Sequence, residues 1–460
     1  MNTEIINGLI KIVGQDWVVT DLSQMQSYLY DETEHIIRPI ANEDCVVVKP
    51  ETTEEVSEIV KLANNELVPI VPRGGGTGEC AAAIPTQSSI ILSLERLNKI
   101  VELDQKNLMI TVESGVTLHE LTEELNKSES LFFPVHPGDE GAQIGGMVVE
   151  NAGGVSAVKH GIMRNHVKGL EVVLPTGEIV NLGGKLIKNN MGYDLLHMMI
   201  GSEGTLGIVT KVILKLYPRS AKVGYLLVSF NTTDEASNVV PKILQEGITP
   251  QAIEYIDREV ALAAAEHLGL NYPATEGSVD LLFIVDEASE DELYAKCERI
   301  VELCEVYGAV DSLIAETTKE QRNLLEIRSN AYTAYKENIA DSLDMAVPPG
   351  FVPDLLRDFK AITKKYNTFS PAVGHIADGN VHNFLMLEEG KLPDYIDDIR
   401  NEMYEAALKY GGTITAEHGT GKLRKKHMIQ QYTSREIEIM KNIKKAFDPN
   451  GILNPGTILD

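Results

Sequence analysis

The chain has 460 residues, 43% of them hydrophobic, which is enough for two or three globular domains. Its 68 acidic residues against 41 basic ones give a formal net charge of -27, which disfavours nucleic acid and anionic lipid surfaces as partners. The N-terminus has no basic start followed by an apolar run, and no stretch approaches the ~20 apolar residues of a membrane helix, so we expect a cytoplasmic protein without membrane insertion.

The first part of the chain predicts alternating helices and strands. Thr52-x-x-Glu55 has the spacing of a capping box and predicts the start of a helix. The short apolar run 68–72, bounded by prolines and followed by glycines, predicts a strand and a turn. Residues 90–94 and 108–112 predict two further strands, and Thr117-x-x-Glu120 predicts the start of another helix.

Two strand patterns complete this first block. Residues 170–174 and 178–180, joined by Pro175-Thr-Gly177, predict a hairpin. Apolar residues then alternate from Leu206 to Leu216, which predicts a strand that Pro218 ends. Residues 1–218 are therefore expected to form one α+β domain rich in glycine loops.

The remaining chain predicts a second α+β domain and a C-terminal segment. Strands are expected at 225–230 and 281–285, and helices at 261–267 and 291–307. The last fifty residues hold a glycine-rich stretch at 411–421, a predicted helix near 436–447 and a tail marked by proline and glycine. We therefore divide the chain into residues 1–218, 219–410 and 411–460.

The four cysteines, Cys45, Cys80, Cys297 and Cys304, are scattered and form no C-x-x-C pair of the kind that binds zinc or an iron–sulfur cluster. We expect four reduced thiols, with Cys297 and Cys304 on the buried face of one helix, because they are seven residues apart in a helical pattern. Any electron-transfer centre would then be an organic cofactor or belong to a partner.

Residues 72–78, Pro-Arg-Gly-Gly-Gly-Thr-Gly, place four glycines directly after a predicted strand. Such a loop can turn successive backbone N–H groups toward one anion, and a pyrophosphate is the guest we expect. The loop is not a Rossmann fingerprint, because Glu79 stands where the third glycine would be, and the chain has no P-loop motif. Alone, a structural glycine turn would be nearly as good an explanation.

Three more glycine-rich loops follow, at 137–146, 151–154 and 201–207. Each glycine costs backbone entropy on folding, so four such loops in one domain are better explained by a long ligand that contacts the backbone at several points.

The second half of the chain suggests a metal site. Asp378-Gly379 is a strong signal for a two-residue hairpin loop, which would place His375 directly opposite His382. Cross-strand partners lie roughly 4.5 to 5.5 Å apart at Cβ, close enough for two imidazoles to bind one metal. The adjacent pair Glu417 and His418 could supply a third ligand and a base, although an isolated pair of surface histidines more often has no such role.

The four glycine-rich loops, in their order and spacing, resemble those of the FAD-binding (PCMH-type) domain of the vanillyl-alcohol oxidase superfamily. Within that superfamily they resemble the branch of glycolate oxidase flavin subunits and D-lactate dehydrogenases. The resemblance covers essentially the whole chain, because the tail Phe447-Asp-Pro-Asn-Gly-Ile-Leu-Asn-Pro-Gly456 also matches that branch. It implies an α+β fold: a two-subdomain FAD domain, an α+β (ferredoxin-like) substrate domain, and a C-terminal segment that returns to the FAD domain.

The resemblance also implies the cofactor and its site. FAD is expected to be non-covalent, because residues 72–79 contain no histidine of the kind that tethers flavin in some relatives. The residues that it assigns to FAD are Pro72, Arg73, Gly74, Gly75, Gly76, Thr77, Gly78, Pro137, Gly138, Gly141, Ala142, Gly145, Gly146, Asn151, Gly153, Gly154, Gly161, Val167, Glu203, Gly204, Gly207, Ile208 and Asn454.

For the chemistry, the resemblance implies that His375, His382 and Glu417 bind a divalent metal (Zn, Mn or Fe) and that His418 is the base. Arg328 falls where relatives place a carboxylate-binding arginine, and an exposed helical arginine is the alternative. The basic run 422–426 is expected to be a solvated helix start.

The function so implied is FAD-dependent oxidation of a small 2-hydroxy acid, with D-lactate first and glycolate or 2-hydroxyglutarate as alternatives. The chain has no haem motif, no iron–sulfur ligands and no second dinucleotide fingerprint, so we expect the electrons to pass to another protein. The resemblance implies that this partner is an electron-transfer flavoprotein, with an iron–sulfur subunit as the alternative. A metal-dependent hydrolase or hydratase would leave the glycine loops without a purpose. A non-catalytic flavoprotein scaffold would leave the histidines and Glu417 unexplained.

Overall fold

The computed structural model describes residues 1–128 and 130–459, which fold into two compact units. Unit 1 comprises Met1–Gly153, Ile162–Arg219 and Glu417–Asp460, and unit 2 comprises Gly154–Gly161 and Ser220–Ala416. The last segment of the chain therefore belongs with the first, while a short piece of the N-terminal half belongs with unit 2. Both units mix helices and sheets, which confirms the expected α+β class.

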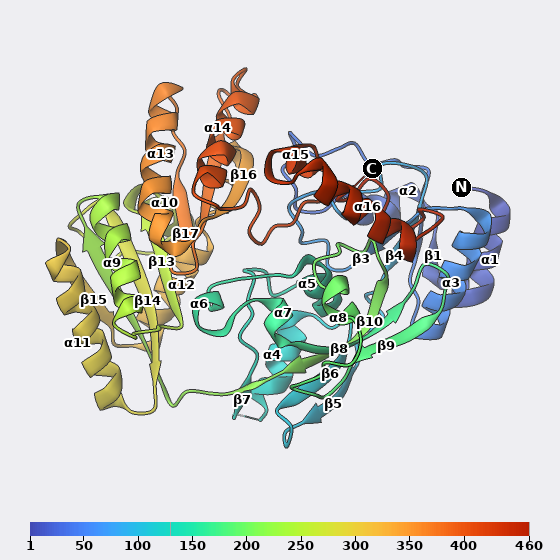
Figure 1. Cartoon of the computed structure of the whole chain (residues 1–460), viewed down its shortest axis with the longest axis horizontal. Coiled ribbons are helices and arrows are strands. Elements are labelled where there is room, and N and C mark those ends of the chain that lie inside the picture. The colour runs from blue at the N-terminus through green and yellow to red at the C-terminus, as the bar shows by residue number, and fades with distance from the viewer. Residues whose placement is uncertain (129, 460) are drawn as a thin grey trace. The chain divides into compact units, whose positions relative to one another are not determined.

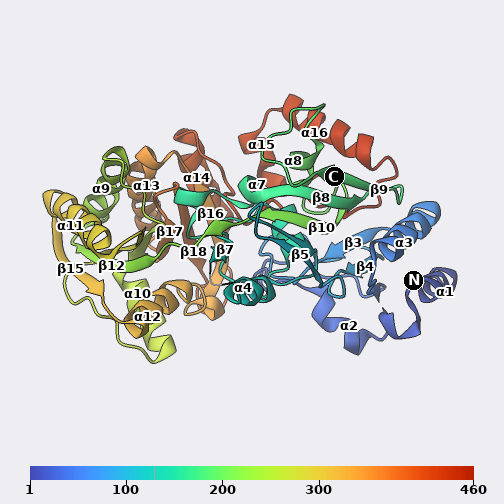
Figure 2. The same ribbon diagram turned by 90° about the horizontal axis from the view of Figure 1, so that it is seen from below.

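Unit 1 begins with a four-stranded sheet of order β1-β2-β4-β3, in which β2, β4 and β3 run parallel. Its strands are β1 Val18–Val19, β2 Val46–Val48, β3 Ile70–Arg73 and β4 Ile90–Ser93. Its helices are α1 Thr3–Val13, α2 Leu22–Leu29 and α3 Thr53–Glu66, and Figure 2 shows α1 beside α3. The α3 helix begins where the sequence predicts it, because the Thr52 side chain accepts a hydrogen bond from the Glu55 N–H.

The second part of unit 1 is a five-stranded antiparallel sheet of order β5-β6-β10-β8-β9. Its strands are β5 Ile100–Asp104, β6 Met109–Glu113, β8 Val167–Val173, β9 Ile179–Gly183 and β10 Ile208–Lys215. The predicted hairpin is the β8–β9 pair. The elements around this sheet are α4 Leu118–Asn126, β7 Leu131–Phe132, α5 Ile144–Glu150, α7 Met163–His166, α8 Leu195–Met199 and β11 Tyr217–Pro218.

The C-terminal segment completes unit 1. Its helices are α15 Met428–Gln431 and α16 Ser434–Phe447, which Figure 2 shows on one side of β8 and β9. Ile443 and Phe447 of α16 pack against the core of the five-stranded sheet. The tail then runs beside β3, where the Ile70 N–H donates to Ile452 and the Asn454 N–H donates to Ile70. The tail thus extends the first sheet at the strand that precedes the glycine loop.

Unit 2 is built on one seven-stranded antiparallel sheet of order β15-β12-β14-β13-β17-β18-β16. Its strands are β12 Lys222–Phe230, β13 Ala252–Asp257, β14 Val279–Glu287, β15 Ala309–Ala315, β16 Ile339–Ala346, β17 Ala372–His375 and β18 Asn380–Met386. Its helices are α6 Ala157–His160, α9 Thr233–Gln245, α10 Arg258–Leu268, α11 Glu290–Val306, α12 Thr318–Ser329, α13 Val352–Lys365 and α14 Ile396–Lys409.

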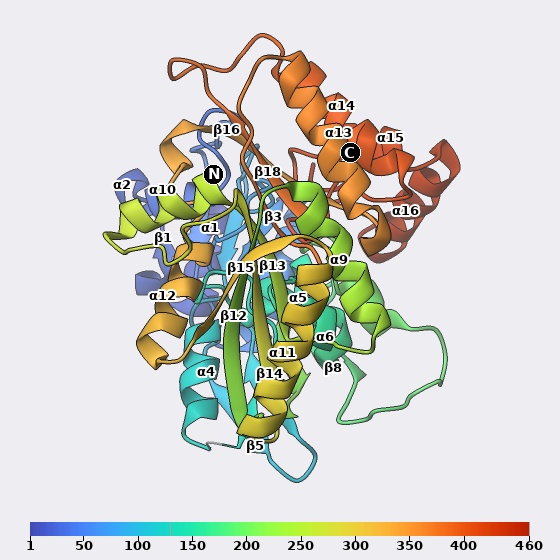
Figure 3. The same ribbon diagram turned by 90° about the vertical axis from the view of Figure 1, so that its left-hand side faces the viewer.

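Helices cover both faces of this sheet. Along β12, Leu226 and Val228 face a core that α9, α11, α13 and α14 close, and Leu227 faces a second core closed by α10 and α12. Figure 3 shows α10 and α12 on one side of the strands and α9 and α11 on the other, and Figure 1 shows α13 beside α14. The last turn of α12 carries Arg328.

The four cysteines are buried and form no disulfide with one another, and Cys297 and Cys304 lie on the buried face of α11 as predicted. In the described part of the chain, no helix combines the length and the apolar character that crossing a bilayer requires.

Candidate active site

The glycine loop begins where β3 ends at Arg73, as the sequence predicts. Gly76 has a φ of 77°, and a Cβ there would overlap the Arg73 guanidinium, so the position requires glycine. Arg73 is itself buried and donates a hydrogen bond of 2.9 Å to the carbonyl of Ser27. Arg73 therefore anchors the loop to the preceding chain.

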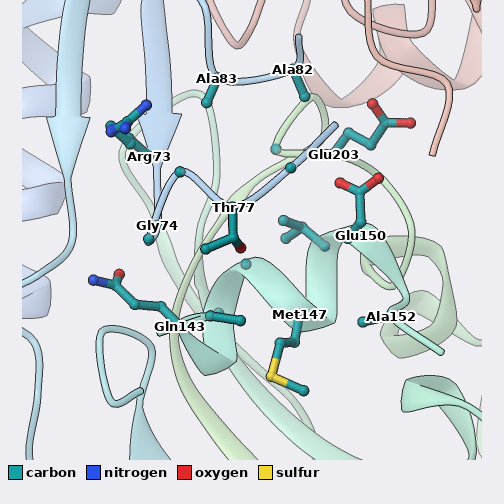
Figure 4. A pocket seen from close by; sticks show the side chains of 18 of the residues that line it. Arg73, Gly74, Thr77, Ala82, Ala83, Gln143, Met147, Glu150, Ala152 and Glu203 are labelled. Atoms are coloured by element: carbon teal, nitrogen blue, oxygen red, sulfur yellow. The ribbon is translucent and has the colours of Figure 1, made fainter. Parts of the chain in front are cut away.

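The loop forms one wall of a cavity that lies within unit 1 (Figure 4). Seventeen of the residues assigned to FAD line this cavity: Pro72, Arg73, Gly74, Gly75, Gly76, Thr77, Gly78, Pro137, Ala142, Gly145, Gly146, Gly153, Glu203, Gly204, Gly207, Ile208 and Asn454. Four segments that are far apart in the sequence therefore meet around one space.

The other six assigned residues do not line the cavity: Gly138, Gly141, Asn151, Gly154, Gly161 and Val167. Gly154 and Gly161 belong to unit 2. Asn151 ends α5 with a φ of 60°, and its side-chain oxygen accepts a hydrogen bond from the Arg164 N–H. Val167 is buried in the core beneath the five-stranded sheet.

The cavity also has walls that motif reasoning missed. These residues are Asp31, Glu79, Ala82, Ala83, Leu94, Met147, Val149, Glu150 and Val209. None of them is a glycine, so no local sequence signal marks them. The side-chain amide oxygen of Gln143 is buried without a hydrogen-bond partner among the described residues, and a Cβ on Gly146 would meet open space. An unsatisfied acceptor and open space over a helix backbone both fit a large cofactor with its own donors.

The C-terminal segment reaches this cavity because Glu203 holds it there. The buried Glu203 carboxylate accepts hydrogen bonds from the N–H groups of Thr420, at 2.8 Å, and Gly421, at 2.7 Å. Burial raises the pKa of Glu203 to about 7 in spite of these two donors. Gly419 approaches both Glu203 and Glu150 so closely that a Cβ would overlap a Glu150 oxygen, and Figure 4 shows these two acidic side chains on the same side of the cavity.

Glu417 and His418 thus lie in the wall of the cavity that the glycine loop also lines. A Cβ on Gly153 would overlap the Glu417 carboxylate, so glycine is needed at that position for the carboxylate to sit there. Nδ1 of His418 lies 3.3 Å from a carboxylate oxygen of Glu79. Glu79, which breaks the Rossmann pattern, therefore contacts the residue expected to be the base.

The predicted two-residue hairpin loop of the second half is wrong. Val373 pairs with His382, and the turn spans residues 376–379, so His375 and His382 are diagonal neighbours and not direct partners. The reason is that Ile376 and Ala377 are buried in the core, while the Gly379 carbonyl accepts from the Val347 N–H. The two histidines still share one face, with ring centroids 5.7 Å apart.

Each of these histidines has a buried carboxylate beside Nδ1. Nδ1 of His375 lies 2.7 Å from Glu254, its direct partner on β13, and Nδ1 of His382 lies 3.6 Å from Asp344 on β16. This arrangement turns both Nε2 atoms away from the carboxylates, as in many metal sites. Asp344 also accepts a hydrogen bond of 2.8 Å from the Ala416 N–H, and Glu417 follows Ala416 in the chain.

Arg328 is 9% exposed, which rules out the exposed-arginine alternative. Its Nη2 atom lies 2.7 Å from the second oxygen of Glu254, and its Nε has no hydrogen-bond partner among the described residues. Burial would raise the pKa of Glu254, but the neighbouring His375 and Arg328 outweigh this effect and lower it.

The solvated helix start predicted at 422–426 is also wrong. Lys422 donates to Ala82 at 2.9 Å and to Thr457 at 2.8 Å, and Arg424 is buried. Burial lowers the pKa of Lys422 to about 8. This segment therefore joins the tail to the chain that follows the glycine loop.

The two protein families that match this chain are families of FAD proteins. Residues 45–183 match the family described as FAD binding domain, and residues 219–458 match the family described as FAD linked oxidases, C-terminal domain. D-lactate dehydrogenase of Archaeoglobus fulgidus is 37% identical, over 94% of this chain and 95% of the relative. D-lactate dehydrogenase of Anaerostipes hadrus is 34% identical, over 90% and 89%, and glycolate oxidase subunit GlcD of Bacillus subtilis is 34% identical, over 89% and 88%.

Solved structures share the fold. p-Cresol methylhydroxylase with substrate bound gives a TM-score of 0.79 at 19% identity, over 99% of this chain and 96% of that one. Alkyldihydroxyacetonephosphate synthase gives 0.74 at 20% identity, over 99% and 85%. The family matches and the curated relatives identify the chain as an FAD-dependent oxidoreductase that belongs to the FAD-linked oxidases.

Proposed function

We propose that this protein oxidises D-lactate to pyruvate, with glycolate and 2-hydroxyglutarate as alternative substrates. The observation that carries the proposal is that His418 lines the same cavity as the glycine loop at 74–78, so a base lies beside the cofactor space. The names of the relatives, two D-lactate dehydrogenases and a glycolate oxidase subunit, support the substrate class.

FAD would occupy the cavity of unit 1, with its pyrophosphate over residues 74–78. When bound, FAD supplies the acceptor for the hydride that leaves C2 of the substrate. We propose that it binds without a covalent link, since residues 72–79 contain no histidine.

We propose that His375, His382 and Glu417 hold a divalent metal, which is Zn, Mn or Fe. A metal at these residues would polarise the substrate hydroxyl and so lower the cost of its deprotonation. Support comes from the carboxylates beside the two Nδ1 atoms and from the hydrogen bond between Ala416 and Asp344, which attaches the residue before Glu417 to the strand beside His382.

In the proposed reaction, Arg328 binds the substrate carboxylate and His418 accepts the hydroxyl proton. The Arg328 guanidinium is buried and retains a donor without a partner among the described residues, which suits the planar recognition of a carboxylate. His418 is suited to this role because a carboxylate oxygen of Glu79 lies 3.3 Å from its Nδ1 and would stabilise the imidazolium that forms when the ring accepts the proton.

We propose that the reduced flavin passes its electrons to an electron-transfer flavoprotein, with an iron–sulfur subunit as the alternative. The four cysteines are buried and scattered in the sequence, and the sequence has no second dinucleotide fingerprint, which supports an external acceptor. Purification of the native protein with its partners tests this step, and a lone chain that reduced NAD or oxygen at full rate would contradict it.

The substrate is tested by turnover with an artificial dye against D-lactate, L-lactate, glycolate and both enantiomers of 2-hydroxyglutarate. We expect the highest kcat/KM with D-lactate. A protein with bound FAD that turned over none of these acids would contradict the proposed function.

A further inference from the structure

Glu254 is a fully buried carboxylate whose two oxygens contact two different functional groups. Its Oε1 atom lies 2.7 Å from Nδ1 of His375, and its Oε2 atom lies 2.7 Å from Nη2 of Arg328. These contacts lie within unit 2 and involve three elements, β13, β17 and α12. A single carboxylate therefore connects a proposed metal ligand with the proposed carboxylate-binding arginine.

The fold explains why Glu254 can do this. Glu254 is the direct cross-strand partner of His375, so the two side chains rise from the same face of the sheet. That face is also the one on which α12 packs, through Leu324 and Ile327, and this packing brings Arg328 over the pair.

From this arrangement we propose that Glu254 is a positioning residue that orients both His375 for metal binding and Arg328 for the substrate carboxylate. The inference rests on the proposed function of these two residues. A carboxylate can only accept hydrogen bonds, so it requires a proton on Nδ1 of His375 and directs Nε2 to a metal, while its second oxygen holds the guanidinium in one orientation.

Glu254→Gln tests this role because the amide is nearly isosteric but has one acceptor and one donor. If the amide N–H faces His375, the imidazole is held in the tautomer with the proton on Nε2, which does not bind a metal. If it faces Arg328, two donors oppose each other. The substitution therefore disturbs at least one of the two partners in any orientation.

The measurement uses the full chain with FAD bound, after treatment with EDTA. Zn²⁺ is titrated in competition with a chromophoric chelator, and the KM for D-lactate is then measured at saturating Zn²⁺, so that the metal and arginine contributions separate. We expect Glu254→Gln to weaken Zn²⁺ binding by about 10- to 100-fold, as for other carboxylates behind a metal-bound histidine. The KM should rise by about 10-fold, because the buried ion pair that orients Arg328 is lost.

Asp280→Asn is the matched control. Asp280 is also fully buried, lies on the neighbouring strand β14 and accepts hydrogen bonds from the guanidinium of Arg258 at 2.6 and 2.7 Å, but contacts neither His375 nor Arg328. Both substitutions should lower the melting temperature, and only Glu254→Gln should change Zn²⁺ affinity and KM. Equal effects of the two substitutions on these constants would overturn the proposal.

Glu254→Asp provides a second variant in case the amide does not yield folded protein. It keeps the charge but withdraws the carboxylate by one methylene. The dissociation constant for Zn²⁺ and the KM for D-lactate should therefore both rise, by smaller factors than in Glu254→Gln. Unchanged constants in either folded Glu254 variant would overturn the role of Glu254 alone. A wild-type protein that bound no Zn²⁺ would instead overturn the proposed metal site, and this inference with it.

Discussion

The imidazole of His418 and the carboxylate of Glu79 form a pair across the cofactor cavity wall, with 3.3 Å between Nδ1 and Oε2. Both residues belong to unit 1, although they are more than three hundred positions apart in the sequence. A carboxylate beside Nδ1 orients the ring and stabilises the imidazolium that forms when Nε2 accepts a proton, which is the role of the acidic residue in catalytic triads.

Glu79→Gln should therefore lower kcat while leaving FAD bound. We expect a loss on the order of 10²- to 10⁴-fold, the range for disturbed acid–base catalysis. Stopped-flow measurement of flavin reduction by D-lactate checks it. Glu140→Gln is the control, because Glu140 makes a similar contact of 3.1 Å with His119 but both side chains are exposed and neither lines the cavity. A rate for Glu79→Gln equal to that of the control would refute the role of Glu79.

The cavity of unit 1 should lose its flavin when Gly146 carries a side chain. A Cβ on Gly146 meets none of the described residues outside its own helix within 4 Å, and Gly146 lines the cavity, so Gly146→Val would fill cofactor space without disturbing the core. Gly350→Val, at a position in unit 2 that is equally open, should keep full occupancy. The flavin absorbance of the purified variants decides this, and acid precipitation of wild-type protein should release all the flavin into the supernatant. Full flavin content in Gly146→Val would contradict the assigned site.

His382 and His418 should separate metal binding from proton transfer. His382→Ala should empty the metal site and abolish turnover, because a proposed ligand is lost, whereas His418→Ala should abolish turnover with the metal still bound. Metal analysis of both variants by plasma emission, together with FAD content, provides the readout. Loss of the metal from His418→Ala would mean that His418 is a metal ligand and not the base.

Glu203 should make unit 1 less stable as the pH rises. A carboxyl whose pKa rises on folding from 4.5 to about 7 contributes stability that is complete below pH 4.5 and is lost as the pH passes through about 7. The contribution is at most about 3 kcal/mol, from 1.36 kcal/mol per pKa unit. The melting temperature of flavin-free wild type, relative to Glu203→Gln, should therefore be higher at pH 5 than at pH 8. The difference in melting temperature between the wild type and Glu58→Gln, a change at an exposed residue, should not depend on pH in this way. If the difference between the wild type and Glu203→Gln were larger at pH 8 than at pH 5, the proposed effect of Glu203 would be wrong.

Local signals in the sequence predicted local structure well. The capping box of Thr117 and Glu120 is formed as expected, because its four groups are within one turn of chain. Most of the glycines assigned to FAD also line one cavity, since glycine is required where loops approach a ligand closely. The predicted register of the hairpin at 375–382 is wrong, because the Asp-Gly signal considers only the residues of the turn itself. In the structure the Val347 N–H, from a segment outside the hairpin, donates to the Gly379 carbonyl.

The parts of the site that depend on distant contacts were not visible in the sequence. Glu254 carries no motif, and its importance follows only from the pairing of β13 with β17 and the packing of α12. Arg328 was recognised by resemblance, but whether it is buried depends on the same packing. In the sequence, Glu79 stands out only because it replaces the third glycine of a Rossmann pattern. Its contact with His418 forms only because the C-terminal segment returns to unit 1.

Bound FAD should take electrons from a D-2-hydroxy acid, with His418 as the base. The most direct test is the anaerobic addition of one equivalent of D-lactate to the purified holoprotein, followed by its flavin absorbance in a stopped-flow instrument. We predict complete bleaching of the wild type by D-lactate, little by L-lactate, and a rate that is about 10²- to 10⁴-fold lower in His418→Ala. Near-normal bleaching of His418→Ala, or a wild-type flavin that D-lactate left oxidised, would contradict this account.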